Sequence, residues 1–301
     1  MRRILWMKGG GLGDFILAFP VLAALRDHFD DTIVEAVGPS GWIALAREWA
    51  DALSSLDALE WMGLYGDGSA LPERLAETDL VVLLRPDPRG LAVQNLYRAG
   101  VGRVLHRDPA PIPDLHQVDH LARVLLPLGI RYHPWPRLDR VFRSRNLPRQ
   151  GPVALHPGSG GVVKTWPTER FVLLARSLSR IGLPVEVILG PVEVERGFGN
   201  AFRDTGVEIV VPPTVVKLAE RLRQARLLVA NDSGVSHLAA AVGCPLVVLF
   251  GPSDPAVWAP RGPRVQVVTS GGGDCARTSI ASISFDQVLE AVRRNLEADT
   301  V

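Results

Sequence analysis

The chain has 301 residues, of which 47% are hydrophobic and 22% are charged. This ordinary globular composition excludes a disordered or fibrous protein, and the length fits one large domain or two of about 150 residues. The formal net charge of +1 leaves no basic surplus for the phosphates of a duplex, so we expect no nucleic acid partner.

Short apolar runs alternate with helical patterns along the chain. The runs are rich in leucine and β-branched residues without polar alternation, which is typical of strands covered on both faces. They predict strands at residues 4–7, 33–37, 80–84, 102–105, 153–156, 185–189, 207–211, 227–230, 246–250 and 265–268. Helical patterns lie near residues 13–28, 41–49, 90–99, 116–128, 168–181, 193–203, 215–225, 235–243 and 285–298. This alternation predicts an α/β fold with doubly wound parallel sheets.

A proline-rich, strand-poor zone around residues 133–152 divides this series, and a new one begins at Val153. We therefore predict two Rossmann-like domains, 1–150 and 151–301, facing across a cleft. The last helix, about 285–298, is the element that could pack back on the first domain. Ligands of such sheets bind outside the carboxyl ends of the strands, so the cleft is the expected site.

Charge is unevenly distributed along the first domain. Residues 1–79 carry 6 basic and 13 acidic side chains, whereas residues 80–145 carry 11 Arg and 5 Asp. The basic stretch is either a solvated Arg-rich face or a surface for an anionic partner. The lysines are only three, Lys8, Lys164 and Lys217, so each of them is a candidate for a specific role.

A glycine-rich turn, KGGGLGD at residues 8–14, follows the first predicted strand. It departs from the dinucleotide pattern G-x-G-x-x-G, counted from Gly9, because Asp14 replaces the third glycine, and a carboxylate there repels a pyrophosphate. Asp14 is then either a helix cap or an exposed general base over the cleft. The glycines would let a substrate approach the backbone closely.

A second glycine-rich turn, HPGSGGVVKTWP at residues 156–167, follows the first strand of the second domain. It nearly matches a P-loop, but Val163 stands where the second glycine belongs and Pro167 delays the helix. A P-loop NTPase is therefore not favoured. A glycine-rich turn that ends in Lys164 still suits phosphate oxygens, and the alternative is a flexible turn with a surface lysine.

The third motif, LVANDSGVSHLAAA at residues 228–241, ends a strand in a small polar turn that opens a helix. The backbone N–H groups of Ser233, Gly234 and Val235 would point out of that helix start and form an anion site. Asp232 is a plain N-cap in the simplest interpretation. A hydrolase triad is not expected, because its members would be sequence neighbours and the turn is not G-x-S-x-G.

Other turns carry weaker signals. After a predicted strand, Glu193 or Glu195 suits the paired hydroxyls of a ribose, or is an ordinary acid in the first turn of a helix. The proline-rich loop at residues 250–260 either walls a nucleotide pocket or is a tight connection. His116 and His120 have the i, i+4 spacing of a metal pair but lack the glutamate of a zincin, so we expect no metal and no cofactor.

These motifs together suit the transfer of a group from a diphosphate donor, without a metal, to a hydroxyl that a carboxylate activates. Lys164 and the helix start at 233–235 would carry the charge of the leaving diphosphate.

At these residues the sequence resembles glycosyltransferase family 9, the ADP-heptose:lipopolysaccharide heptosyltransferases. The matching motifs follow one another in order over roughly 290 residues. They are Gly13-Asp14 with Leu17-Ala18-Phe19-Pro20, His156-Pro157-Gly158 with Lys164-x-Trp166-Pro167, Asn231-Asp232-Ser233-Gly234 with Ser236-His237-Leu238-Ala239-Ala240, Phe250-Gly251-Pro252-Ser253-Asp254-Pro255, and Cys275 with Ile283-Ser284.

The resemblance implies a GT-B fold and inverting, metal-independent transfer of a heptose, or a related sugar, from an ADP-sugar to a hydroxyl of an anionic lipopolysaccharide-core acceptor. It implies that Asp14 is the base, that Lys164 contacts phosphate, that Asp232 shapes the donor loop and that Glu193, with Glu195 as the rival, meets the ribose. The further donor-side candidates are Gly158, Ser159, Thr165, Ser233, Gly234, Val235 and His237. The acceptor-side candidates are Gly11, Gly13, Arg85 and Arg89.

Three alternatives stay open: a GT-B-type nucleotide-sugar epimerase or hydrolase, a non-catalytic nucleotide-sugar-binding protein, and a Rossmann oxidoreductase. The residues alone do not identify the base, the sugar, the acceptor linkage or the oligomeric state. Because Cys244 and Cys275 cannot form a disulfide framework and no run of about 18 apolar residues occurs, we expect a cytoplasmic protein. Any membrane contact would be peripheral, at the inner face of the cytoplasmic membrane.

Overall fold

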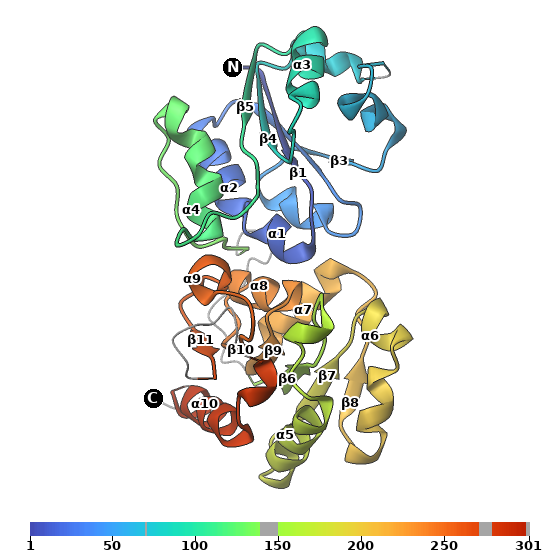
Figure 1. The fold of residues 1–301 in the computed structure, drawn as a ribbon, viewed down its shortest axis with the longest axis vertical. Helices are drawn as coiled ribbons and strands as arrows, with labels where there is room; N and C mark the ends of the chain where they lie inside the picture. The colour runs from blue at the N-terminus through green and yellow to red at the C-terminus, as the bar shows by residue number, and fades with distance from the viewer. Residues whose placement is uncertain (70, 139–149, 271–278, 299–301) are drawn as a thin grey trace. The chain divides into compact units, whose positions relative to one another are not determined.

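The computed structural model describes residues 1–69, 71–138, 150–270 and 279–298. The chain divides into two units, Met1–Pro136 and Arg137–Val301, and each contains one parallel sheet (Figure 1). The first unit is shorter than the predicted 1–150 because Leu138 already packs within the second. Its side chain is buried, and its N–H donates to the carbonyl of Ala241 at 2.9 Å.

The first sheet has the strand order β3-β2-β1-β4-β5, with every pair parallel. The strands are β1 Arg3–Lys8, β2 Ile33–Gly38, β3 Ala52–Ser55, β4 Leu80–Leu84 and β5 Arg103–His106. The helices are α1 Leu12–Ile16, α2 Phe19–His28, α3 Leu91–Arg98 and α4 Gln117–Ala122, with 3₁₀ segments at Ile43–Glu48, Leu59–Tyr65, Glu73–Glu77 and Arg123–Leu128. α2 and α4 cover one face of the sheet, and α3 covers the other (Figure 1).

The segment after β1 forms two helices where the sequence pattern predicts one over 13–28. The break lies at Leu17 and Ala18, because Pro20 in the first turn of α2 has no N–H to donate to the carbonyl of Ile16. The apolar side chains on both sides of the break are still buried, as the pattern requires. The rings of Phe15 and Phe19 are in edge-to-face contact, with centroids 5.3 Å apart.

β3 is a strand that the sequence pattern does not predict, because Leu53 is its only large apolar side chain. Its pairing with β2 holds it in place, from Glu35 opposite Ala52 to Gly38 opposite Ser55. The hydroxyl of Ser54 also donates to the buried carboxylate of Glu35 at 2.7 Å.

The second sheet has the strand order β11-β10-β9-β6-β7-β8, and every pair is again parallel. The strands are β6 Val153–His156, β7 Val185–Ile188, β8 Glu208–Val210, β9 Leu227–Asn231, β10 Leu246–Leu249 and β11 Val265–Val268. The helices are α5 Thr168–Arg180, α6 Pro191–Glu195, α7 Val215–Gln224, α8 Gly234–Ala241, α9 Pro255–Trp258 and α10 Phe285–Glu297, with 3₁₀ segments at Val162–Lys164, Phe198–Thr205 and Ile280–Ser282. Among the described residues, none of these helices combines the length and the apolar character needed to cross a bilayer.

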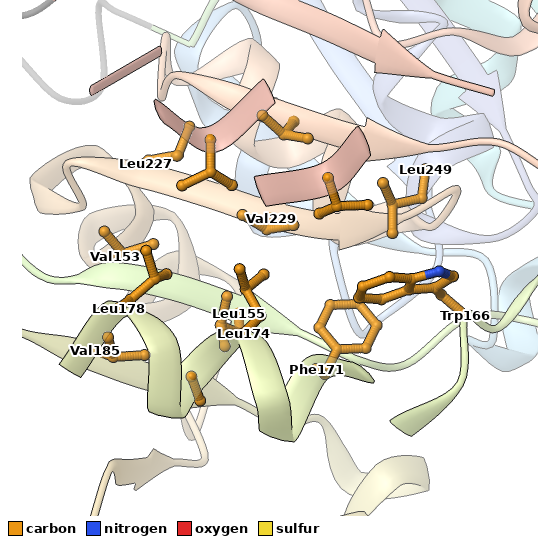
Figure 2. Packing of buried hydrophobic residues seen from close by; sticks show 14 of the residues in the cluster. Val153, Leu155, Trp166, Phe171, Leu174, Leu178, Val185, Leu227, Val229 and Leu249 are labelled. Carbon is orange, nitrogen blue, oxygen red and sulfur yellow. The ribbon is translucent and has the colours of Figure 1, made fainter. Parts of the chain in front are cut away.

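A continuous apolar core fills the space between the second sheet and helix α5 (Figure 2). The rings of Trp166 and Phe171 meet edge to face, with centroids 5.1 Å apart. α10 places Val288 and Val292 in this same core, so the apolar face of the last helix is used within the second unit.

Two polar side chains tie the segment before α10 to this core. The indole N–H of Trp166 donates to the carbonyl of Ile283 at 2.9 Å. The guanidinium of Arg170 donates to the carbonyls of Ala281 and Ile283, at 2.7 Å each. The C-terminal segment is therefore attached to α5 through its main chain.

Replacing Phe171 with Ala should lower the free energy of unfolding by about 3–5 kcal/mol, because it removes a fully buried ring and leaves a cavity. Urea denaturation followed by circular dichroism measures the change. Leu173→Ala is the matched control on the same helix, since Leu173 is 44% exposed, and it should cost no more than about 1 kcal/mol. Equal costs for the two variants would contradict the placement of this core.

Candidate functional site

The carboxyl ends of the adjacent strands β7, β6 and β9 bring three of the predicted turns together. Parallel neighbours end at the same edge of a sheet, and β6 lies between the other two, with His156 opposite Ala230. The turns that follow these strands contain Glu193, the 156–167 motif and the 231–235 motif. This donor edge, as we name it, belongs wholly to the second unit.

Asn231, the last residue of β9, holds the 156–167 turn in place from a fully buried position. Its amide nitrogen donates to the carbonyls of Pro157 and Gly158, at 2.8 and 3.3 Å. Its amide oxygen accepts from the N–H of Trp166 at 3.1 Å. One side chain therefore fixes both ends of the turn that carries Lys164.

Lys164 and Asp232 form an ion pair, with Nζ 2.8 Å from Oδ2. The aspartate side chain is buried, whereas 38% of the lysine side chain is exposed, so the ammonium lies at the boundary with solvent. Ser159 adds a second link, because its hydroxyl donates to the carbonyl of Asp232 at 2.8 Å. The simplest interpretation of Asp232, as the N-cap, is therefore wrong, because the N-cap of α8 is Ser233 and the Asp232 carboxylate holds the lysine of the neighbouring turn.

α8 begins at Gly234, with Ser233 as its N-cap residue. Within the described part of the chain, the N–H groups of Ser233, Gly234 and Val235 donate to no protein acceptor. Unpaired N–H groups at the start of a helix bind anions. His237 lies one turn further on and is buried. The geometry thus puts one cation and several backbone donors at neighbouring turns of one edge.

Of the two glutamates left open by the sequence, Glu193 lies at the donor edge. It is buried at the start of α6, where its Oε2 accepts from the N–H of Gly190 at 2.9 Å. Its carboxylate also packs against Gly158, where an added Cβ would come within 2.1 Å of Oε1. Glu195 is exposed on the far side of the same turn of helix.

The 156–167 turn is not a P-loop. Its lysine ends a 3₁₀ turn, Val162–Lys164, and α5 begins only at Thr168, after Pro167. The hydroxyl of Thr165 donates back to the carbonyl of Gly161 at 3.3 Å, so it is used inside the turn. His156 is buried beneath the turn, where its Nδ1 lies 2.9 Å from the carbonyl oxygen of Ile188, and burial lowers the pKa of its ring.

At the carboxyl edge of the first sheet, Asp14 lies in the first turn of α1. Its Oδ2 accepts from the N–H of Gly11 at 3.2 Å, so it is a helix cap. Gly10 has a φ of +100°, and a Cβ there would lie 3.0 Å from Cβ of Asp14. Gly10 is therefore the glycine of this run that the close approach of the backbone to the carboxylate requires. Gly13 lies inside α1 and, as a glycine, has no side chain with which to contact a ligand.

Lys8 and Arg85 complete this edge, because Lys8 ends β1 opposite Leu84, the last residue of β4. Arg85 passes beside Gly9, and its guanidinium lies 5.1 Å from the ring centroid of Tyr65. Lys8 is almost completely buried, and desolvation lowers its pKa to about 8. The negative charge of Asp14 raises this pKa in part, and the positive charge of Arg85 lowers it further. The sequence marks Lys8 only as one of three lysines; its place at the end of a buried strand is the signal that could have identified it.

The remaining sequence candidates lie apart from these clusters. Arg89 is exposed in the turn before α3. Both ring nitrogens of His120 have protein partners: Nδ1 lies 3.0 Å from a guanidinium nitrogen of Arg107, and Nε2 lies 2.8 Å from the carbonyl oxygen of Asp108. Among the described residues, His, Cys, Asp and Glu side chains form no group of three or more that could hold a metal.

Asn231→Ala should lower the free energy of unfolding by about 1–3 kcal/mol, since it leaves buried backbone groups at both ends of the 156–167 turn without partners. Chemical denaturation of the variant measures this. Asn200→Ala is the control, because Asn200 is exposed, and it should change the free energy by less than about 0.5 kcal/mol. A neutral Asn231→Ala variant would contradict the role of this amide.

Comparison with known proteins identifies the family of the chain. The model of glycosyltransferase family 9 (heptosyltransferase) matches residues 132–285. The chain is 28% identical over 307 aligned residues to lipopolysaccharide heptosyltransferase 1 of Pseudomonas aeruginosa, covering 91% of this chain and 85% of that protein. It is 24% identical over 290 residues to lipopolysaccharide heptosyltransferase 3 of Escherichia coli K12, covering 82% of each.

The fold is also found among solved structures. That of E. coli heptosyltransferase WaaC with ADP-2-deoxy-2-fluoro heptose is similar with a TM-score of 0.74 and 20% sequence identity, and the match covers 97% of this chain and 99% of that one. The two parallel sheets are those of a GT-B protein. With the family match extending over more than half of its length, this chain belongs to glycosyltransferase family 9 and is a glycosyltransferase.

Proposed function

We propose that this protein transfers a heptose from an ADP-heptose donor to a hydroxyl of a lipopolysaccharide-core acceptor, with inversion at the anomeric carbon and without a metal. The family supports the sugar transfer, and the relatives in Pseudomonas aeruginosa and E. coli are named lipopolysaccharide heptosyltransferases. The similar E. coli structure contains an ADP-heptose analogue, which supports the choice of donor. The reaction would take place in the cytoplasm, with any membrane contact peripheral.

The observation that carries the proposal is the donor edge. Lys164 is held by Asp232 beside the unpaired N–H groups at the start of α8. A diphosphate bound there would meet the ammonium and the N–H groups of Gly234 and Val235 together. Such fixed donors stabilise the charge that develops on a leaving diphosphate, and they need no reorganisation during the reaction. These residues therefore replace the charge that a divalent cation provides elsewhere.

The ribose of the donor would lie against Glu193. Glu193 lies in the first turn of α6, which follows β7, the strand next to β6, and its carboxylate is buried beside Gly158. A carboxylate at this place in a doubly wound sheet accepts hydrogen bonds from the paired hydroxyls of a ribose. Ser159, Thr165 and His237 would shape the pocket around the phosphates and not contact them as charges.

In the transfer step, Asp14 would take the proton from the acceptor hydroxyl as that oxygen attacks the anomeric carbon. The bond between this carbon and the diphosphate oxygen breaks on the opposite face, and ADP leaves with its charge on the donor edge. A single displacement of this kind inverts the anomeric centre. Gly11 and Gly13 would let the acceptor approach the carboxylate, and Arg85 and Arg89 would attract an anionic acceptor.

Asp14→Ala should abolish transfer, with a fall in turnover of at least about 10²-fold, because the acceptor hydroxyl loses its general base. Binding of ADP, measured by calorimetry, should stay nearly unchanged, since Lys164 and Glu193 belong to the other unit. Asp14→Asn keeps an oxygen for the N–H of Gly11 and guards against loss of folding. Asp67→Asn, at an exposed turn, is the control.

The same assay separates the alternative functions. Transfer that survives Asp14→Asn would refute the assignment of the base. Release of free sugar in the absence of an acceptor would support a hydrolase, and formation of an epimeric nucleotide sugar would support an epimerase. Tight binding of ADP-heptose with no turnover on any acceptor would support a non-catalytic binding protein.

Glu193→Gln should weaken ADP binding by about tenfold or more, because the ribose hydroxyls lose a charged acceptor. Glu195→Gln on the same helix is the matched control and should leave the Kd unchanged. With 2′,3′-dideoxy-ADP, which lacks both hydroxyls, wild type and Glu193→Gln should bind alike. If Glu195→Gln alone reduces the affinity, the assignment of the two glutamates is reversed.

A further inference from the structure

Lys8 presents a buried ammonium group to which the proposed function assigns no role. The residue ends β1, the central strand of the first sheet, and only 3% of its surface is exposed. Within the described residues, Nζ takes part in no hydrogen bond and no ion pair. The charged groups that act on it are Asp14 of α1 and Arg85 after β4, while β2 ends beside it in Gly38.

A buried charge without a partner destabilises a fold, and in this case a second cation adds to the cost. Desolvation and Arg85 both lower the pKa of Lys8, to about 8, although the Asp14 carboxylate opposes them. Lys8 therefore keeps most of its charge at neutral pH at the expense of stability. A methionine of similar length would fill the same space without that cost.

Neither neighbour provides Lys8 with a partner of its own. The Asp14 carboxylate makes its hydrogen bond to the N–H of Gly11. The Arg85 guanidinium lies over the ring of Tyr65, and the carbonyl of Arg85 lies 2.8 Å from Nε2 of His106. The ammonium of Lys8 is therefore available to bind an anionic group of a ligand. It lies beside Asp14, the proposed base.

We propose that Lys8 binds an anionic substituent, a carboxylate or a phosphate, of the acceptor and so positions the neighbouring hydroxyl on Asp14. The proposal rests on the proposed function, since it names a substrate group for that same site. An anionic oxygen satisfies the buried ammonium, and its burial makes the charge-assisted hydrogen bond stronger than at the surface. Arg85 and Lys8 together then favour acidic acceptors over neutral ones.

The small number of lysines allows a direct test on the whole protein. In protein labelled with ¹³C at Cε of lysine, Lys8, Lys164 and Lys217 give three signals, which Lys8→Met and Lys217→Met assign. The Lys8 signal should titrate near pH 8 in the free protein. Acetate or inorganic phosphate should raise this midpoint, whereas glycerol should not. A Lys8 midpoint that neither anion moves would overturn the proposal.

Kinetics with the acceptor test the same point during turnover. Lys8→Met should raise the KM for an acidic core oligosaccharide about 10- to 100-fold, with the donor KM unchanged. Lys8→Arg should restore part of the affinity. The effect should vanish with a carboxyl-reduced acceptor if the anion is a carboxylate, or with a phosphatase-treated acceptor if it is a phosphate. An unchanged KM, or an equal loss on all acceptors, would overturn the proposal.

Stability separates binding from a merely structural role. Lys8→Met should melt at the same or a higher temperature than wild type at pH 7. The stability that the variant gains over wild type should shrink as the pH rises above about 8. In that range unfolded wild type binds more protons at Lys8 than the folded protein does, so the stability of wild type increases with pH. A lower melting temperature would indicate a structural lysine. Lys217→Met is the control, since Lys217 is exposed and pairs with Glu220 at 2.7 Å.

The two proposals can fail separately. If wild-type protein transfers no sugar to any acceptor, the proposed function fails, and the lysine signals still report whether Lys8 binds an anion. If wild type is active and Lys8→Met retains its preference for acidic acceptors, the proposed function stands and the role of Lys8 is refuted.

Discussion

The donor edge depends on one buried amide. Asn231 is fully buried at the end of β9, and its side chain makes hydrogen bonds to both ends of the 156–167 turn, which is far from it in sequence. An amide has both donors and an acceptor, so it can bridge carbonyls on one side and an N–H on the other. Because those groups belong to the backbone, Lys164 and Gly158 are positioned before any ligand arrives. Preorganisation of this kind lets a site stabilise charge without rearrangement.

The two sheet edges deal with charge in opposite ways. At the donor edge, Lys164 has Asp232 as a counter-ion, so its charge is paired before a ligand binds. At the edge of the first sheet, Lys8 and Arg85 face a single carboxylate, and burial works against the lysine. Such an imbalance is typical of functional sites, where stability is given up for binding. The first edge is therefore the one whose properties should respond more strongly to an anionic ligand.

Much of the fold follows from the sequence, because β-branched runs and amphipathic helices are local patterns. One exception has a local cause and another has a long-range cause. Pro20 divides a helical pattern without changing its apolar face, and β3 exists only because β2 pairs with it. The sequence also indicates the turns that carry Asp14 and Lys164. It cannot indicate that Asn231 holds the 156–167 turn, or that Lys8 is buried without a partner, because both depend on which strands are neighbours.

The link between Arg170 and the C-terminal segment has a consequence for sequence variation. Both acceptors are main-chain carbonyls, of Ala281 and Ile283, and every amino acid, proline included, supplies such a carbonyl. The side chain of Ala281 is exposed and takes no part in the link. Related chains can therefore vary at position 281 without losing this link, whereas a change of Arg170 removes two of the hydrogen bonds that hold the segment and leaves the one from Trp166.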